Sequence, residues 1–385
     1  MKKKKVLFLI WSFTAGGGAE KILANIVNNI NYDKYEIYVL EYKNLNVKKE
    51  FVNEQVTIEK PIIVQDGNIF NRIKNKLIQY LTYKNPKLLY NYYIKDKYDI
   101  EVAFNYMIPS ILVSNSKAKK YTVVHSSIED LDYKKASKQD FKDIQFKYNL
   151  QKDSFKKMNN IVAISNKTEE SIINLFPEVS DKVIKIYNGY DFDKLNEQSN
   201  IRKCVVSNDK KFTLIAIGRL VKQKNFSFLI DIAKKLSDEK MNYQLLILGE
   251  GDERSKIEDK IKGYNLEDTV KLLGYIDNPY PYLKEADLFC LTSIAEGFPT
   301  VLVESLALGC PFISTDVAGA DELSDKGRCG IVTNDINEYV INIKKILNDT
   351  ELRKRMAKNG VELIKKYSIS NQISRIEEMF EAEGI

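Results

Sequence analysis

The sequence predicts an α/β protein made of two doubly wound parallel-sheet domains. Short apolar runs typical of buried strands alternate with amphipathic stretches typical of helices, and the alternation stops only once, in a polar stretch at residues 196–211. The length of 385 residues suits about two domains. Because the apolar runs do not alternate with polar residues, the strands are expected to be parallel and covered by helices on both faces.

The first domain is expected over residues 1–198. Residues 5–40 contain a strand, a glycine loop, a helix and a strand, the usual opening of a nucleotide-binding α/β domain. The N-terminal lysines and apolar run resemble a signal peptide, but Ser12, Thr14 and three glycines interrupt the run, so it is predicted to be a strand. Further strands are expected at 100–105, 120–125, 160–165 and 182–189.

The second domain is expected over residues 210–368, after a linker at 196–211. Its alternation begins with an apolar strand at 212–220 and ends in a pair of helices. Its other strands are expected near 243–251, 270–275, 287–293 and 310–314, and its helices near 225–236, 253–261, 280–286, 336–347 and 350–367.

Composition limits the class of protein. Apolar residues make up 44% and charged residues 29%, as in soluble globular proteins, and no apolar run approaches the roughly 20 residues that span a bilayer. A net charge of +6 is too small to indicate nucleic acid as a partner. The four cysteines are scattered along the chain, which indicates neither a zinc site nor a disulfide framework. They are predicted to be reduced core residues of a cytoplasmic protein. These cysteines are Cys204, Cys290, Cys310 and Cys329.

One stretch, residues 287–314, carries the most chemistry. A buried strand is followed by a loop, a helix and another strand, and Pro299 suits the first helical position. Backbone N–H groups at such a helix start can bind phosphate. Those expected to do so belong to Phe298, Thr300 and Val301.

Two carboxylates accompany that helix start. Glu296 lies in the loop and Glu304 on the second turn, where they could accept hydrogen bonds from sugar and ribose hydroxyls; taken singly, each could be an ordinary polar residue. The string EGFPTVLVESLALGCPFIS, from Glu296 to Ser314, resembles the Glu, seven residues, Glu signature of retaining glycosyltransferases of family four. The resemblance implies the GT-B fold, with the last helix, 369–385, returning to the first domain.

The resemblance also implies roles for two loops. In AGGGAEK, which lacks the dinucleotide fingerprint, Gly17 and Gly18 match places where backbone approaches the donor diphosphate. In GRLVKQKNF, Arg219 and Lys224 match groups that hold the two phosphates. The plain alternatives are a tight glycine turn and a solvated basic turn. Loops at 248–253 and 272–278 resemble those that frame the base, without distinguishing uridine from guanosine.

His125, the only histidine, follows the strand at 120–125. It could be a hydrogen-bonded core residue, whereas the family places a histidine there to hold the transferred sugar and stabilise charge. No metal and no cofactor are expected. Asp130 with Asp132, and Asp191 with Asp193, match a metal-binding Asp, any, Asp pattern that is common by chance.

Residues 67–95 form a basic, aromatic segment without any acidic residue. Apolar residues fall there at helical spacing beside Arg72, Lys74 and Lys76. This suits an interfacial helix on an anionic membrane, and equally an amphipathic helix whose apolar face packs on its own domain. The apolar residues at that spacing are Phe70, Ile73, Leu77, Ile78 and Leu81.

The sequence therefore predicts a retaining, metal-independent hexosyltransferase. It would move a hexosyl or N-acetylhexosaminyl group from a nucleoside-diphosphate sugar, with UDP favoured, to a glycan or lipid-linked saccharide in surface polysaccharide or glycoconjugate synthesis. It would work in the cytoplasm, either free or peripherally bound to the inner face of the cell membrane. The alternatives are a non-catalytic GT-B scaffold subunit and a nucleotide-sugar epimerase, while the missing fingerprint argues against a dehydrogenase.

Overall fold

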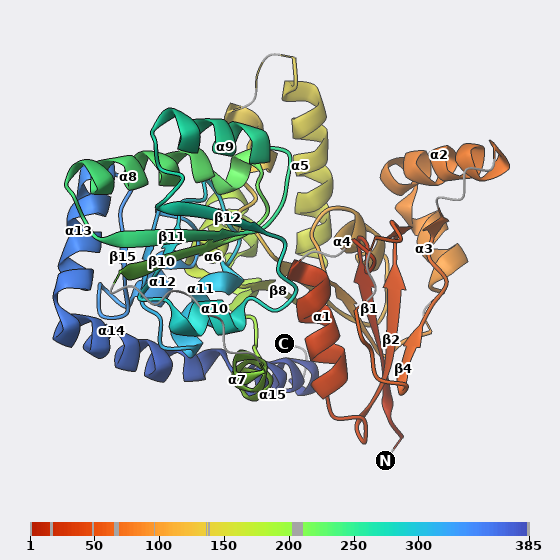
Figure 1. Cartoon of the computed structure of the whole chain (residues 1–385). Helices are drawn as coiled ribbons and strands as arrows, with labels where there is room; N and C mark the ends of the chain where they lie inside the picture. The colour runs from red at the N-terminus through yellow and green to blue at the C-terminus, as the bar shows by residue number, and fades with distance from the viewer. Residues whose placement is uncertain are drawn as a thin grey trace. The chain divides into compact units, whose positions relative to one another are not determined.

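The chain consists of two compact units, described here from a computed structural model. The structure describes residues 2–15, 18–47, 50–64, 69–95, 97–135, 137, 139–201 and 211–382. The first unit is Met1–Tyr190 with Ile369–Ile385, and the second is Asp191–Ser368. Each unit contains a parallel sheet with helices packed on it, which confirms the predicted fold class (Figure 1).

The first unit is built on a seven-stranded parallel sheet in the order β4-β2-β1-β6-β7-β8-β9. From β1 the chain builds outward to β2 and β4, then returns to the other side of β1 as β6. The order therefore reverses between β1 and β6, and this is the topological switch point of the first unit. The strands are β1 (Lys4–Ile10), β2 (Tyr35–Glu41), β4 (Val56–Ile58), β6 (Ile100–Ala103), β7 (Lys119–Val124), β8 (Asn160–Ala163) and β9 (Val183–Lys185), with a separate pair, β3 (Lys43–Asn44) and β5 (Ile63–Val64).

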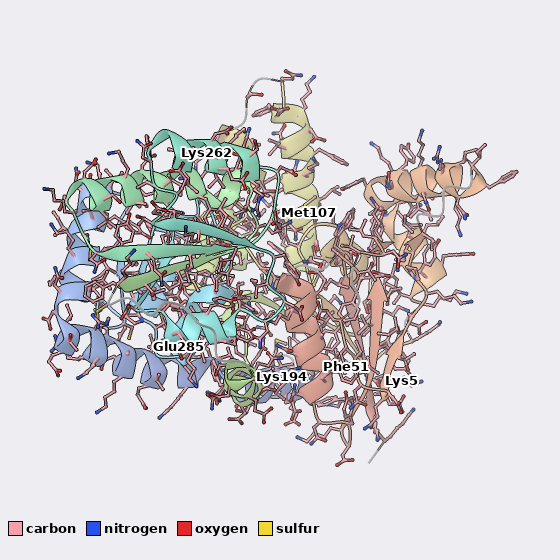
Figure 2. The ribbon with its side chains drawn as sticks, viewed as in Figure 1. Lys5, Phe51, Met107, Lys194, Lys262 and Glu285 are labelled. Carbon is pink, nitrogen blue, oxygen red and sulfur yellow. The ribbon has the colours of Figure 1, made fainter. Side chains whose placement is uncertain are left out.

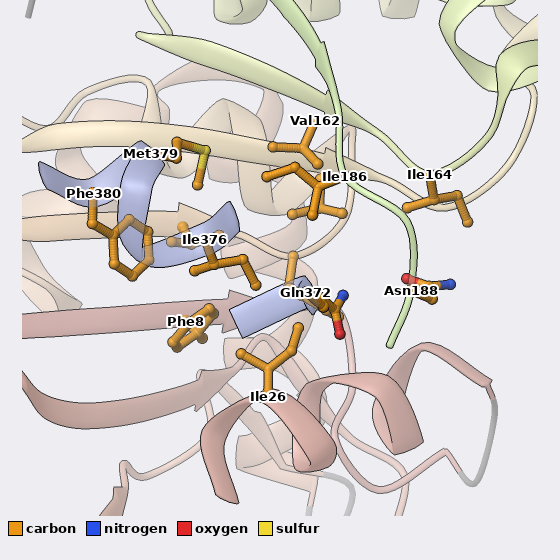
Figure 3. Close-up of a pocket in the computed structure, with 13 residues that line it drawn as sticks. Phe8, Ile26, Val162, Ile164, Ile186, Asn188, Gln372, Ile376, Met379 and Phe380 are labelled. Atoms are coloured by element: carbon orange, nitrogen blue, oxygen red, sulfur yellow. The ribbon is translucent and has the colours of Figure 1, made fainter. Parts of the chain in front are cut away.

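The C-terminal helix α15 completes the core of the first unit. Figure 3 shows Phe380, Ile376 and Gln372 of α15 near Phe8 and Ile26, around a cavity of about 20 Å³. A space of that size holds about one water molecule, so this cavity belongs to the core and is no ligand site. The helices of this unit are α1 (Gly18–Asn29), α2 (Ile69–Lys84), α3 (Pro86–Tyr93), α4 (Ile108–Val113), α5 (Phe141–Lys156), α6 (Asn166–Leu175) and α15 (Ile369–Glu381).

The second unit has a six-stranded parallel sheet in the order β12-β11-β10-β13-β14-β15. Here the strand order reverses between β10 and β13. The strands are β10 (Phe212–Ile217), β11 (Tyr243–Leu248), β12 (Val270–Gly274), β13 (Leu288–Leu291), β14 (Phe312–Ser314) and β15 (Gly330–Val332). The helices are α7 (Phe192–Asn200), α8 (Phe226–Asp238), α9 (Arg254–Gly263), α10 (Tyr280–Glu285), α11 (Thr300–Ala307), α12 (Ala320–Ser324), α13 (Ile336–Asn348) and α14 (Thr350–Leu363).

Three details differ from the sequence expectations. Helix α7, assigned to the first domain by the boundary at residue 198, belongs to the second unit, because Asn278 and Lys284 hydrogen-bond to its C-terminal end. Strands β3, β4, β5 and β15 were not predicted, since two or three residues are too few to show a period. Pro299 is the N-cap of α11 and not its first helical residue, because its ψ of 97° is extended.

Two further expectations can be compared with the described residues. None of the described helices is long and apolar enough to cross a membrane. Cys290, Cys310 and Cys329 are buried free thiols, and Cys204 lies outside the described residues. Burial raises the pKa of Cys310 to about 12, as expected of an unreactive core thiol.

Candidate functional site

In the second unit, two loops meet at the switch point between β10 and β13. The loop after β10 contains a short 3-10 turn, Lys222–Lys224, and the loop after β13 begins at Thr292. Gln223 joins them twice: its carbonyl accepts from the Ile294 N–H at 2.8 Å, and its side-chain amide donates to the Ala295 carbonyl at 2.7 Å. Because ligands of doubly wound sheets bind beside such a point, this edge is the candidate donor site.

Lys224 and Glu296 form an ion pair at this edge. Lys224 Nζ lies 2.5 Å from Glu296 Oε1, and the two side chains are only 21% and 12% exposed. Thr292 Oγ1 fixes the loop by donating to the Lys224 carbonyl at 3.1 Å. Partial burial makes this pair stronger than one in full solvent. It places a cation and a carboxylate side by side, each able to exchange its partner for a polar ligand.

Two glycines bring the loop after β11 against this edge. A Cβ on Gly249, which has a φ of +146°, would lie 1.9 Å from the Gly218 carbonyl oxygen, and a Cβ on Gly251 would lie 2.4 Å from that of Leu220. Because these glycines carry no side chain, the two loops approach closely enough for the Leu220 N–H to donate to the Glu250 carbonyl at 2.8 Å. The loop at 248–253, predicted to frame the base, therefore packs directly on the loop after β10.

Helix α11 begins beside the Glu296 loop. Phe298 is 7% exposed, and its ring packs on Tyr367 and against Gly319, so its side chain anchors the loop in the core. The first N–H groups of α11, at Thr300 and Val301, have no acceptor within the helix and suit an anion. The sequence predicted these two donors together with the N–H of Phe298.

Glu304 is a nearly buried carboxylate on α11, 7% exposed. Its Oε1 accepts a hydrogen bond from the Tyr280 hydroxyl at 3.1 Å. Tyr280, the first residue of α10, was not predicted as a site residue, because an aromatic residue in a Pro-Tyr-Pro run is typical of core. The hydroxyl fixes one oxygen of the carboxylate and orients the side chain.

The other predicted donor residues are less constrained. Arg219 is exposed, and its guanidinium makes no ion pair with a described residue. Gly18 is the exposed first residue of α1, with open space where a Cβ would lie, whereas Gly17 lies outside the described residues. Of the predicted residues, Lys224 and Glu296 contact each other directly through their side chains.

His125 belongs to the first unit and follows β7. Its ring lies 4.6 Å from the ring of Phe104 and hydrogen-bonds to the Phe104 backbone. Burial lowers the pKa of His125 to about 4, so the imidazole is neutral at pH 7. Nε2 is buried and has no hydrogen-bond partner among the described residues. A neutral ring with one unsatisfied nitrogen is suited to hydrogen bonding and not to electrostatic pairing.

A pocket of about 390 Å³ opens at the switch point of the first unit. Trp11 follows β1 and stacks on Tyr42, with 5.2 Å between ring centroids. The Tyr106 hydroxyl donates to both oxygens of Asp130, at 3.2 and 3.3 Å. The pKa of Tyr106 is raised mainly by burial and further by the negative charge of Asp130. The lining residues are Trp11, Tyr83, Asn105, Tyr106, Met107, Ile108, Pro109, Asp130, Leu131 and Lys147.

Buried polar side chains fix the shape of this pocket. Met107, labelled in Figure 2, has a left-handed φ of +59° before α4. Its N–H donates to Oε1 of the fully buried Gln151 at 2.5 Å, which holds the strained backbone in place. Glu41 likewise ties the loop after β1, accepting from the Phe13 N–H at 2.9 Å and from Thr14 Oγ1 at 3.1 Å. The sequence did not reveal either clamp.

The suspected metal motifs have other partners. Asp130 accepts from Tyr106, Asp132 pairs with Lys135 at 3.4 Å, and Asp191 caps α7 by accepting from the Lys194 N–H. Within the described ranges, no group of three or more His, Cys, Asp or Glu residues could hold a metal ion.

The chain matches known glycosyltransferases in sequence. Residues 197–363 match the model of the family "Glycosyl transferases group 1". An uncharacterized glycosyltransferase of Methanocaldococcus jannaschii is 32% identical over 57% of this chain and 63% of its own length, so the chain spans under two thirds of that relative. The Campylobacter jejuni N-acetylgalactosamine-N,N'-diacetylbacillosaminyl-diphospho-undecaprenol 4-alpha-N-acetylgalactosaminyltransferase is 27% identical over 91% of this chain and 92% of its own.

Solved structures share the fold over nearly the whole chain. Anabaena Alr3699/HepE in complex with UDP aligns with a TM-score of 0.72 and 20% identity, covering 97% of this chain and 99% of its own. WaaG, a glycosyltransferase involved in lipopolysaccharide biosynthesis, aligns with a TM-score of 0.71 and 13% identity, covering 98% and 100%. The whole chain therefore has the GT-B fold, and residues 197–363 match the group 1 glycosyl transferase family, in agreement with the resemblance to family four.

Proposed function

We propose that this protein is a retaining glycosyltransferase that uses a UDP-sugar and needs no metal ion. The transferred group is a hexosyl or N-acetylhexosaminyl residue, and the acceptor is a glycan or lipid-linked saccharide. The observation that carries the proposal is the second-unit switch point, where Lys224 pairs with Glu296 in the loop that leads into α11, the helix that bears the buried Glu304. The UDP bound by Alr3699/HepE and the undecaprenol-linked acceptor named for the Campylobacter relative support the choice of donor and acceptor.

In this proposal the second unit binds the nucleotide. Glu304, oriented by Tyr280, accepts hydrogen bonds from the vicinal ribose hydroxyls. Arg219, Lys224 and the first N–H groups of α11 bind the two phosphates and stabilise the charge that develops on the leaving diphosphate. These groups supply positive charge of the kind a metal ion provides in other transferases, which supports metal independence.

The Lys224–Glu296 pair changes partners when the donor binds. Lys224 turns to the phosphates, and Glu296 is released to accept hydrogen bonds from hydroxyls of the transferred sugar. Neutral His125 holds another sugar hydroxyl through the nitrogen that lacks a protein partner. Because neither group is assigned as a nucleophile, the acceptor attacks on the face that the diphosphate leaves, through an oxocarbenium-like state.

The pocket of the first unit is assigned to the acceptor. Trp11 offers an apolar ring face to a sugar, while Asp130 and Tyr106 offer hydrogen bonds to its hydroxyls. Trp11 is the only tryptophan of the chain, so its fluorescence reports on this pocket alone. Titration with saccharide acceptors is expected to change Trp11 emission, and UDP alone is not.

A transfer assay tests the function directly. Purified protein is incubated with UDP-sugars and an undecaprenyl-diphosphate-linked saccharide, with and without a chelator, and the product is analysed by NMR. We expect a glycoside with the anomeric configuration of the donor, formed equally with the chelator. An inverted product contradicts retention, a requirement for divalent metal contradicts metal independence, and UDP-sugar turnover without any acceptor would indicate an epimerase or hydrolase.

A further inference from the structure

Helix α2 does not pack on the protein through its most apolar face, as an ordinary amphipathic helix would. Its fully buried residues are Ile78 and Thr82. Polar groups on the same side bind the rest of the unit: Asn75 Nδ2 donates to the Val64 carbonyl at 2.9 Å, and Thr82 Oγ1 shares a 2.8 Å hydrogen bond with the Tyr42 hydroxyl. Anchoring of this helix therefore depends on hydrogen bonds together with the side chains of Ile78 and Leu81.

The opposite side of α2 presents an apolar stripe to solvent. The stripe consists of Ile69, Phe70, Ile73, Leu77 and Tyr80, which are 56–81% exposed. At 100° per residue these five positions fall within about a third of the helix circumference, centred roughly opposite Ile78 and Thr82. Single exposed apolar residues are common, but five on one helical face form a continuous patch. Of the five apolar positions predicted at helical spacing, Ile78 and Leu81 pack on the core. The other three, Phe70, Ile73 and Leu77, are exposed, so the alternative that they pack on their own domain is wrong.

Charge distinguishes the kinds of partner that could cover the stripe. Arg72 and Lys76 flank it on one edge and Lys74 on the other, and residues 67–95 contain no Asp or Glu. A second copy of the same helix would bring these cations against each other. An anionic lipid surface attracts all of them, and it also accepts the apolar stripe and its tyrosine at the boundary between headgroups and acyl chains.

We propose that α2 is a membrane-docking helix that lies flat on an anionic bilayer, with the stripe buried among the lipids. The helix also contributes Tyr83 to the first-unit pocket, so docking brings that pocket to the membrane surface. The docking proposal stands on the exposure and charge of α2 and does not depend on transferase activity. If the acceptor assignment also holds, the headgroup of a lipid-linked saccharide reaches the pocket while its chain stays in the bilayer.

Vesicle flotation of the full chain tests the proposal. Vesicles of phosphatidylcholine alone are compared with vesicles that also contain phosphatidylglycerol, using wild type and the double variant Ile73→Gln with Leu77→Gln. Glutamine keeps helix propensity while removing the apolar surface. The matched control is Ile341→Gln, an isolated residue on α13 that is 62% exposed. UDP-induced thermal stabilisation is recorded for each protein and reports separately on the donor site and on folding.

We expect wild type and Ile341→Gln to float with the anionic vesicles and the double variant to lose at least tenfold in partitioning. Lys74→Ala and Lys76→Ala should each weaken partitioning about fivefold, and more salt should weaken it further. The proposal is overturned if wild type ignores anionic vesicles, or if the double variant floats as well as wild type. It is also overturned if the stripe mediates a dimer that the double variant converts to a monomer. Loss of UDP stabilisation with flotation intact would instead count against the donor site alone.

Discussion

The two switch points of this molecule are lined by different kinds of residue. In the second unit the edge between β10 and β13 is assembled from glycine loops, a lysine, two glutamates and a helix start. In the first unit the edge between β1 and β6 is assembled from aromatic rings, supported by the buried Glu41 and Gln151. The first set suits a charged diphosphate and the second a sugar ring. The same sheet topology therefore offers two sites of different chemistry.

The largest effect is expected from removing the cation of the second-unit site. Lys224→Ala should lower kcat about 10²–10³-fold, because one preorganised group that stabilises leaving-group charge is worth that much. The matched control is Lys222→Ala, which lies two residues earlier in the same 3-10 turn and is exposed. Steady-state kinetics with a saturating acceptor provide the measurement.

If Lys224→Ala and Lys222→Ala lowered kcat equally, the positive charge of the loop would matter and the particular position of Lys224 would not. That result would contradict the role assigned to Lys224. Because Lys224→Ala leaves the part-buried Glu296 without its partner, circular dichroism must confirm that the variant is folded.

A smaller effect is expected in the aromatic site of the first unit. Trp11→Ala should raise the KM for the acceptor about tenfold, since a lost ring stack contributes about 1.4 kcal/mol. The dissociation constant for UDP should stay unchanged, and Trp11→Phe should keep most of the acceptor affinity. If Trp11→Ala instead weakened UDP and left the acceptor KM alone, the assignment of the two sites would have to be exchanged.

The smallest effect concerns His125 and pH. Its folded-state pKa of about 4 lies below the ordinary value of 6.5, so the unfolded chain binds the proton more readily and stability falls as pH drops from about 6.5 towards 4. Between pH 7.0 and 5.5 the free energy of unfolding should fall by about 1 kcal/mol from this residue. As the only histidine, it can be isolated by comparing wild type with His125→Gln in urea titrations at both pH values. An equal fall in the two proteins would contradict the burial of the ring.

The second-unit site was the easier one to predict from sequence. Its residues lie in short contiguous strings, and a Glu, seven residues, Glu spacing places both carboxylates relative to one helix start. The direct Lys224–Glu296 contact was not predicted, because it joins loops 72 residues apart and depends on β10 and β13 being neighbours in the sheet. Tyr280 was missed because its Pro-Tyr-Pro run is typical of core, and because its contact with Glu304 joins two separate segments of the chain.

The first-unit pocket could not be predicted from sequence. Its lining residues come from positions 11 to 147, and the groups that fix them are buried polar residues with no local signal. Gln151 is the clearest case, because an amide in a helix rich in polar residues looks like a surface residue until the strained Met107 is placed beside it.

The most direct test of the account is a calorimetric titration with UDP. The account predicts that UDP binds the wild type better than GDP, ADP or dTDP. Loss of the buried carboxylate in Glu304→Ala should weaken UDP about 10- to 100-fold, because hydrogen bonds to a charged group contribute about 1.5–3 kcal/mol. Glu285→Ala, at the exposed end of α10, should bind as wild type does. Wild type that fails to bind UDP at millimolar concentration, or Glu304→Ala that binds it unchanged, would contradict the assignment of the second-unit switch point as the donor site.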